Sequence, residues 1–174
     1  GIGWRRSLQH KAFLNTAQPF VSVVIAARNE ATNLPLLLQD LLQQQYTNME
    51  VIVVDDHSED NTSECFHQTV RALNDPSRRY TCLVNTGSGK KAALSTGIAQ
   101  ANGDIIFTTD ADCRLPATWI SKTVEQFDED THMLVGAVRI TGTSFTDRLQ
   151  QLEFASLMAS GAATLAYHLP TMAN

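Results

Sequence analysis

The chain of 174 residues is long enough for one domain with its own core, and a composition of 43% hydrophobic and 18% charged residues excludes a disordered chain. The formal net charge is -5 and no stripe of lysine and arginine stands out, which argues against nucleic acid as a partner. The three cysteines show no CxxC spacing, which argues against a zinc site or a disulfide framework and favours a reducing, cytoplasmic location.

The first half of the chain is expected to contain two strands, each followed by a helix. Residues 1–19 are polar and irregular, and we expect a short helix or an arm there. The apolar, β-branched run at 21–26 predicts a buried strand, and leucines at helical spacing predict a helix over 34–42. A second strand is expected over 49–54, followed by a less regular helix over 62–73.

The second half continues the same alternation. We expect a third strand over 80–84, a helix over 90–100 and a fourth strand over 105–109. A proline then opens a predicted helix over 116–127, and a fifth strand is expected over 133–140.

Strands that alternate with helices at short intervals predict an α/β fold with a mostly parallel sheet flanked by helices. We therefore expect an N-terminal arm at 1–19, an α/β domain at 20–142 and a further segment at 143–174. Small and apolar residues from Asp147 to Leu169 predict a helix in that last segment. It packs closely on the domain or lies at a membrane interface; the first alternative is favoured because its polar face is not rich in lysine and arginine.

Acidic residues follow three of the predicted strands. Glu30 comes after the first strand, Asp55 and Asp56 after the second, and Asp110 and Asp112 after the fourth. In an open parallel sheet these strand ends share one edge, so the carboxylates are expected to meet at one crevice. Paired carboxylates there are a hard-oxygen site suited to Mg²⁺ or Mn²⁺.

The loop Gly87–Lys91 invites comparison with a phosphate-binding loop. It lacks the Walker A spacing, because Val84 stands where the first glycine belongs and Lys91 stands where serine or threonine should follow the lysine. A glycine-rich loop with a lysine at a helix N-terminus can still bind an anion; a solvated loop with surface lysines is the alternative.

Four segments together resemble the family 2 glycosyltransferases of the GT-A fold. They are Val21–Glu30 (VSVVIAARNE), Val51–Ser58 (VIVVDDHS), Gly89–Leu94 (GKKAAL) and Asp110–Asp112 (DAD). They occur in the family's order across residues 20–140. The resemblance implies an inverting enzyme that uses a nucleotide sugar, of which this chain is the N-terminal, donor-binding part.

The resemblance also implies roles for individual residues. The donor-binding residues would be Ala27, Arg28, Glu30, Asp56, Lys90 and Asp110. Within this set, Asp56 matches a position that hydrogen-bonds a uracil ring, and Asp110 would contact ribose, sugar or metal. Asp112, together with Asp110, would bind the Mn²⁺ or Mg²⁺ ion that bridges the diphosphate.

The catalytic base of the family usually lies beyond a segment that resembles Leu169–Asn174, so we expect it beyond Asn174 and the α/β domain to be incomplete here. The implied partners are a nucleoside-diphosphate sugar, a UDP-sugar by the Asp56 match, and a saccharide or lipid-linked acceptor. A membrane-tethered parent protein at the inner face of the cell membrane is implied by membrane-associated relatives. Two alternatives stay open: a nucleotidyltransferase that makes nucleotide sugars, and a non-catalytic nucleotide-binding module.

Overall fold

The computed structural model describes residues 2–5, 18–128, 131–136, 148, 151–152 and 156. The chain divides into two compact units, residues 1–135 and residues 136–174. The sheet and helices below belong to the first unit. In the second, Arg148, Gln151, Leu152 and Ser156 are helical, and the rest of the helix expected from Asp147 lies outside the described residues.

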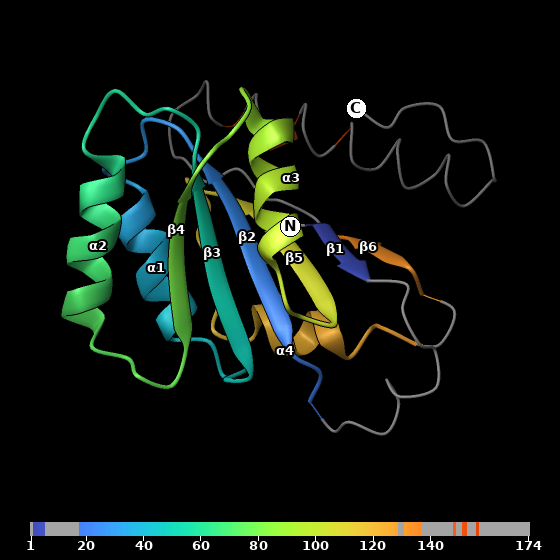
Figure 1. Ribbon diagram of the computed structural model, residues 1–174. Coiled ribbons are helices and arrows are strands. Elements are labelled where there is room, and N and C mark those ends of the chain that lie inside the picture. The colour runs from blue at the N-terminus through green and yellow to red at the C-terminus, as the bar shows by residue number, and fades with distance from the viewer. Residues whose placement is uncertain are drawn as a thin grey trace. The chain divides into compact units, whose positions relative to one another are not determined.

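The first unit is built around a six-stranded sheet of order β4-β3-β2-β5-β1-β6 (Figure 1). In chain order its strands are β1 (Ile2–Arg5), β2 (Val21–Ala27), β3 (Met49–Asp55), β4 (Arg79–Val84), β5 (Ile105–Asp110) and β6 (Met133–Val135). The four strands from β4 to β5 are parallel, whereas β1 runs antiparallel to both of its neighbours. The predicted α/β class with a mostly parallel sheet is confirmed.

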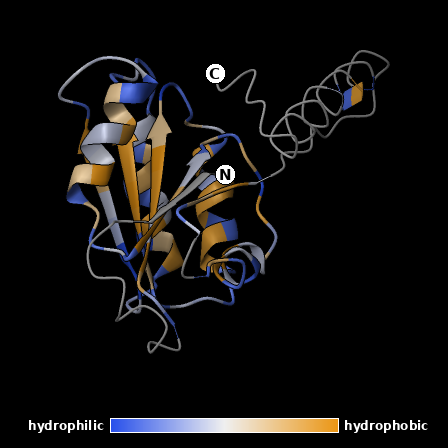
Figure 2. Cartoon of the chain, turned by 90° about the vertical axis from the view of Figure 1, so that its right-hand side faces the viewer, coloured by the Kyte–Doolittle hydropathy of each residue, from blue (hydrophilic) through white to orange (hydrophobic). Residues whose placement is uncertain are grey.

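Helices cover both faces of this sheet. They are α1 (Leu34–Leu42), α2 (Thr62–Leu73), α3 (Lys90–Gln100) and α4 (Trp119–Val124). Leucines of α1, Phe66 of α2 and Ile120 of α4 pack on one face with Val23 and Phe107. On the other face, α3 packs against Val24, Ile52, Val54 and Ile106. Figure 2 shows the strands between these helices as largely hydrophobic.

The predicted helices over 62–73 and 90–100 have the bounds of α2 and α3, and the predicted helix over 34–42 has those of α1. The helix expected over 116–127 is shorter, because residues 117–118 and 125–126 form turns around α4. Of the strand expected over 133–140, β6 covers Met133–Val135, and 137–140 lie outside the described residues.

The irregular N-terminal arm expected at 1–19 is wrong for Ile2–Arg5, which form β1. This strand pairs Ile2 with Thr108 on β5 and with Val135 on β6. Four residues are too few to show a strand periodicity, and the partners that satisfy their backbone groups lie far along the chain. Only the tertiary structure could therefore reveal this strand.

The strand order reverses between β2 and β5. From β2 the chain proceeds through β3 to β4 on one side, and α3 then returns it to β5 on the other side of β2. Ligands of open α/β sheets bind beyond the carboxyl ends of the strands at such a reversal. No helix in the described part of the chain is both long enough and apolar enough to cross a membrane.

Candidate active site

A pocket of about 220 Å³ lies at the carboxyl ends of β2, β3 and β5, beside the first residue of α3. Its lining residues are Ala26, Ala27, Arg28, Glu30, Asp56, Lys90, Asp110, Ala111 and Asp112. Every donor-binding or metal-binding residue that the sequence predicted is in this set. The strand reversal therefore gathers residues that are up to 86 positions apart, Ala26 to Asp112, at one opening.

Asp56, which directly follows β3, is buried, with 4% of its surface exposed. Its Oδ1 atom accepts a hydrogen bond from Nδ2 of Asn85 at 2.6 Å and one from the backbone N–H of Gly89 at 3.0 Å. The Asn85 hydrogen bond, helped by the Gly89 N–H and the positive charge of Arg28, holds the pKa of Asp56 below its ordinary value although burial opposes this. The carboxylate is therefore ionised at neutral pH, and the Asn85 and Gly89 donors both bind its Oδ1 atom.

Asn85 holds Asp56 in place, and the sequence reasoning did not identify it. It directly follows β4, is 2% exposed, and its Oδ1 accepts hydrogen bonds from Gly87 N–H at 3.1 Å and from Thr96 Oγ1 at 3.4 Å. Gly89 has a φ of 85°, a conformation that glycine adopts readily and other residues rarely do. The sequence does carry one signal for Asn85: it is a polar residue at the end of a strand, one strand away from Asp55 and Asp56.

The loops that follow β2 and β3 support each other. Ser58 Oγ accepts a hydrogen bond from Asn29 N–H at 2.9 Å, and Asn29 Oδ1 accepts one from Glu59 N–H at 2.8 Å. Glu30 N–H donates to Thr62 Oγ1 at 2.8 Å. These bonds join the loop after β2 to the loop after β3 and to the start of α2, so they fix the backbone directly after Arg28.

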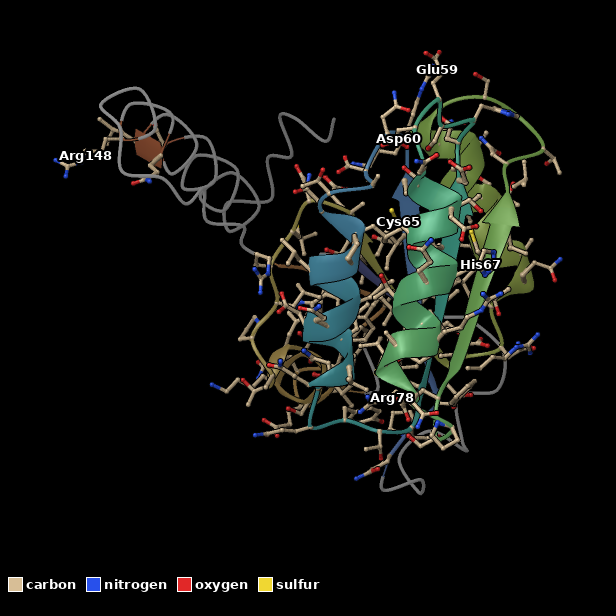
Figure 3. The ribbon with its side chains drawn as sticks, turned by 90° about the vertical axis from the view of Figure 1, so that its left-hand side faces the viewer. Glu59, Asp60, Cys65, His67, Arg78 and Arg148 are labelled. Carbon is tan, nitrogen blue, oxygen red and sulfur yellow. The ribbon has the colours of Figure 1, made fainter. Side chains whose placement is uncertain are left out.

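Asp60, which precedes the N-cap residue Asn61, binds the first residue of α2 through its side chain. Its Oδ1 atom accepts a hydrogen bond from Thr62 N–H at 3.0 Å, and its Oδ2 atom accepts one from Ala31 N–H at 3.1 Å. Figure 3 shows Glu59 and Asp60 at the end where α2 begins, with Arg78 at the opposite end. Asp55, the last residue of β3, does not line the pocket. Its Oδ1 accepts hydrogen bonds from the N–H and Oγ of Ser58 at 3.1 and 2.5 Å, which tie the strand end to the following loop.

Lys90 and Asp110 form an ion pair at the pocket, with 2.6 Å between Nζ and Oδ1. Both side chains are more than half exposed, so water screens the pair and it adds little to stability. Asp112 is also exposed. The pocket therefore presents a mobile ammonium group and two solvent-accessible carboxylates, which can exchange partners when a charged ligand enters.

No group of three or more His, Cys, Asp or Glu side chains that could hold a metal ion occurs among the described residues. Mg²⁺ and related hard cations are commonly held by one or two carboxylates together with substrate phosphates. Asp110 and Asp112, which line the same pocket two residues apart, fit that kind of donor set.

Curated relatives match this chain over much of its length. The undecaprenyl-phosphate 4-deoxy-4-formamido-L-arabinose transferase of Yersinia pestis (strain Pestoides F) is 38% identical over 133 residues, 72% of this chain and 38% of the relative. The enzyme of the same name from Yersinia enterocolitica is 37% identical over 126 residues, 68% of this chain and 36% of the relative. The chain thus spans well under half of these relatives.

Solved structures and a family model agree with these relatives. The mannosyltransferase PcManGT from Pyrobaculum calidifontis, in complex with GDP-Man and Mn²⁺, matches 62% of this chain and 34% of its own with a TM-score of 0.54 and 31% identity. TarS 1-349 from S. aureus, in complex with UDP, matches 61% of this chain and 31% of its own chain, with a TM-score of 0.50 and 26% identity. These likenesses confirm the GT-A fold, and the model of glycosyl transferase family 2 matches residues 22–172. The chain therefore belongs to glycosyl transferase family 2.

Proposed function

We propose that the pocket binds a nucleoside-diphosphate sugar, specifically a UDP-sugar, whose sugar is transferred to an acceptor hydroxyl with inversion at the anomeric carbon. The observation that carries this proposal is that one pocket is lined by every residue assigned to donor or metal binding. The buried carboxylate of Asp56 lies on the β3 side of the pocket. The exposed charges of Lys90 and Asp110 lie on its α3 and β5 sides. This division suits a ligand with a flat base at one end and a diphosphate at the other.

Asp56 is the proposed base-recognition residue. The Asn85 and Gly89 donors occupy its Oδ1 atom, which leaves Oδ2 to accept a hydrogen bond from the ligand. Uracil has an N–H at position 3, whereas cytosine has an unprotonated acceptor there. An ionised carboxylate therefore selects uracil over cytosine at this point of the pocket.

Asp112 and Asp110 are the proposed residues for Mn²⁺ or Mg²⁺, which would neutralise the diphosphate leaving group. In the reaction, the acceptor oxygen forms a bond to the anomeric carbon while the bond from that carbon to the diphosphate oxygen breaks. Lys90, and Arg28 on the β2 side, line the same pocket and would bind the negative charge that the leaving diphosphate gains. Lys90 would give up its contact with Asp110 to do so.

The acceptor hydroxyl loses its proton to a general base, a step to which a positioned base contributes about 10²–10⁴-fold. Asp56 is held by two donors, and Asp110 and Asp112 are assigned to the donor and the metal, so none of them is a good candidate. The expectation of a base beyond Asn174 remains a prediction.

The proposed acceptor is lipid-linked, in keeping with the undecaprenyl phosphate in the names of the two Yersinia relatives. Such an acceptor would place the reaction at the cytoplasmic face of a membrane. Because the matched part is less than half of those relatives, their acceptor is a hypothesis for this chain.

Isothermal titration of the purified protein with UDP, with Mn²⁺ and with EDTA, tests the donor site. We expect Mn²⁺ to strengthen UDP binding and Asp112→Asn to abolish that gain while leaving binding in EDTA unchanged. Equal affinity with Mn²⁺ and EDTA in the unmodified protein would remove the metal role. Release of UDP on transfer, as opposed to pyrophosphate, separates a glycosyltransferase from a nucleotidyltransferase.

A further inference from the structure

Helix α1 makes a buried contact with the segment that follows β5. The Asp40 carboxylate, 7% exposed, accepts hydrogen bonds from Arg114 Nε at 2.7 Å and Nη2 at 2.8 Å. It also accepts the backbone N–H of Leu115 at 2.9 Å. The guanidinium thus binds the carboxylate with two parallel hydrogen bonds, a geometry that fixes direction as well as distance.

Gln44 and Gln45, which follow the C-terminal end of α1, continue the contact. Gln44 Nε2 donates to the Pro116 carbonyl at 2.8 Å, and its Oε1 accepts the Ile120 N–H at 3.2 Å. The Gln45 N–H donates to the Ala117 carbonyl at 2.9 Å. The segment from Arg114 to Ile120 is therefore hydrogen-bonded to Asp40 of α1 and to Gln44 and Gln45 just after the helix.

The loop from Asp110 to Arg114, which carries Asp112, is held at both of its ends. At one end β5 is paired with β2, with Asp110 opposite Ala26. A turn follows, in which Cys113 N–H donates to the Asp110 carbonyl at 3.2 Å. At the other end, two residues after Asp112, the Arg114 side chain is bound to Asp40. The backbone that carries Asp112 has little freedom while both ends hold.

We propose that Asp40 and Arg114 are positioning residues that aim the Asp112 carboxylate at the divalent cation, without contacting cation or nucleotide themselves. This inference rests on the proposed function of the pocket. Outer residues that orient metal ligands typically change metal affinity 10–100-fold when replaced. A lysine at position 114 would keep the charge but lose the two-pronged geometry, since it is a point charge on a flexible stem.

The test is UDP titration, with Mn²⁺ and with EDTA, of the unmodified protein, Arg114→Lys and Asp40→Asn. Arg71→Lys makes the same chemical change on the exposed side of α2 and is the matched control. We expect the Mn²⁺-dependent gain in UDP affinity to fall at least about tenfold in both variants. Affinity in EDTA should stay within twofold, because Asp56 is untouched, and the control should behave like the unmodified protein.

If Asp40 and Arg114 only stabilise the fold, their replacement would lower the UDP affinity equally with Mn²⁺ and with EDTA. That result overturns the proposal. A Mn²⁺ gain within twofold of the unmodified protein in Arg114→Lys also overturns it. The Arg114 side chain is 61% exposed, so this variant keeps the inference testable even if Asp40→Asn unfolds. Failure of the unmodified protein to show any Mn²⁺ gain would refute the metal role itself.

Discussion

Replacing Gly97 by alanine should push α3 away from the sheet. A methyl group at this position would lie 2.4 Å from Val24 Cγ1 and 3.1 Å from Val54 Cγ2. Carbon atoms in ordinary contact are at least 3.4 Å apart, so the first distance is short by about 1 Å. Val24 is fully buried on a central strand and stiff about χ1, so the helix has to move instead.

Two opposing terms decide the size of the effect. Overpacking a close-packed core costs about 1–3 kcal/mol. Alanine in place of glycine in a helix returns about 1 kcal/mol. We therefore expect Gly97→Ala to lower the free energy of unfolding by up to about 2 kcal/mol.

The displacement should also reach the pocket. The first turn of α3 carries Lys90, and Gly89 immediately before it donates its N–H to Asp56. UDP affinity should therefore fall along with stability, although Gly97 lies outside the pocket lining.

Urea denaturation and UDP titration measure the two effects. Ser95→Ala, an exposed site on the same helix, is the control and should be neutral or slightly stabilising. In a double-mutant cycle, Val24→Ala removes the clashing methyl groups, so the pair should cost less than the sum of the single changes. Unchanged or increased stability in Gly97→Ala would refute the reasoning, as would strict additivity in the cycle.

Three further predictions concern titratable groups. Burial raises the pKa of Tyr46 from 10.0 to about 12, so its stabilising contribution is complete below pH 10 and is lost as the pH rises toward 12. At pH 11 the loss should be about 1.4 kcal/mol by urea denaturation and absent in Tyr46→Phe; an equal loss in that variant would contradict it. The Arg114 hydrogen bonds hold the pKa of Asp40 below 3.8, so the stability that the ionised carboxylate contributes is present above that pH and is lost on further acidification. In Asp40→Asn, the melting temperature should therefore fall less steeply as the pH is lowered below 3.8. Asp56→Asn should weaken UDP binding by roughly tenfold in titration, and GDP binding as tightly as UDP to the unmodified protein would show the uracil assignment to be wrong.

The sequence predicts those parts of the fold that repeat a local pattern. The leucines of α1 and the apolar runs of β2 and β3 bury one face or both, and this leaves a periodic signal within a short window. The pocket was also predictable, because Asp56 and Asp110 follow such runs, and parallel strands bring their ends to one edge.

Contacts between distant segments were not predictable. Asn85 was missed because its role depends on β4 lying beside β3, and Asp40 reads as one more polar residue on a leucine-rich helix. Its partner Arg114 is 74 positions away. The ion pair between Lys90 and Asp110 is of the same kind, since no short window contains both residues.

The position of β1 constrains the order in which the sheet can assemble. β1 is the strand nearest the N-terminus, yet its partner Thr108 emerges from the ribosome roughly a hundred residues later, and β6 pairs with β1 rather than with β5. Closing so long a loop is slow relative to forming local contacts. β6 emerges after every other strand of the sheet and pairs with β1, so the edge formed by β1 and β6 is the last part of the sheet to be completed during synthesis.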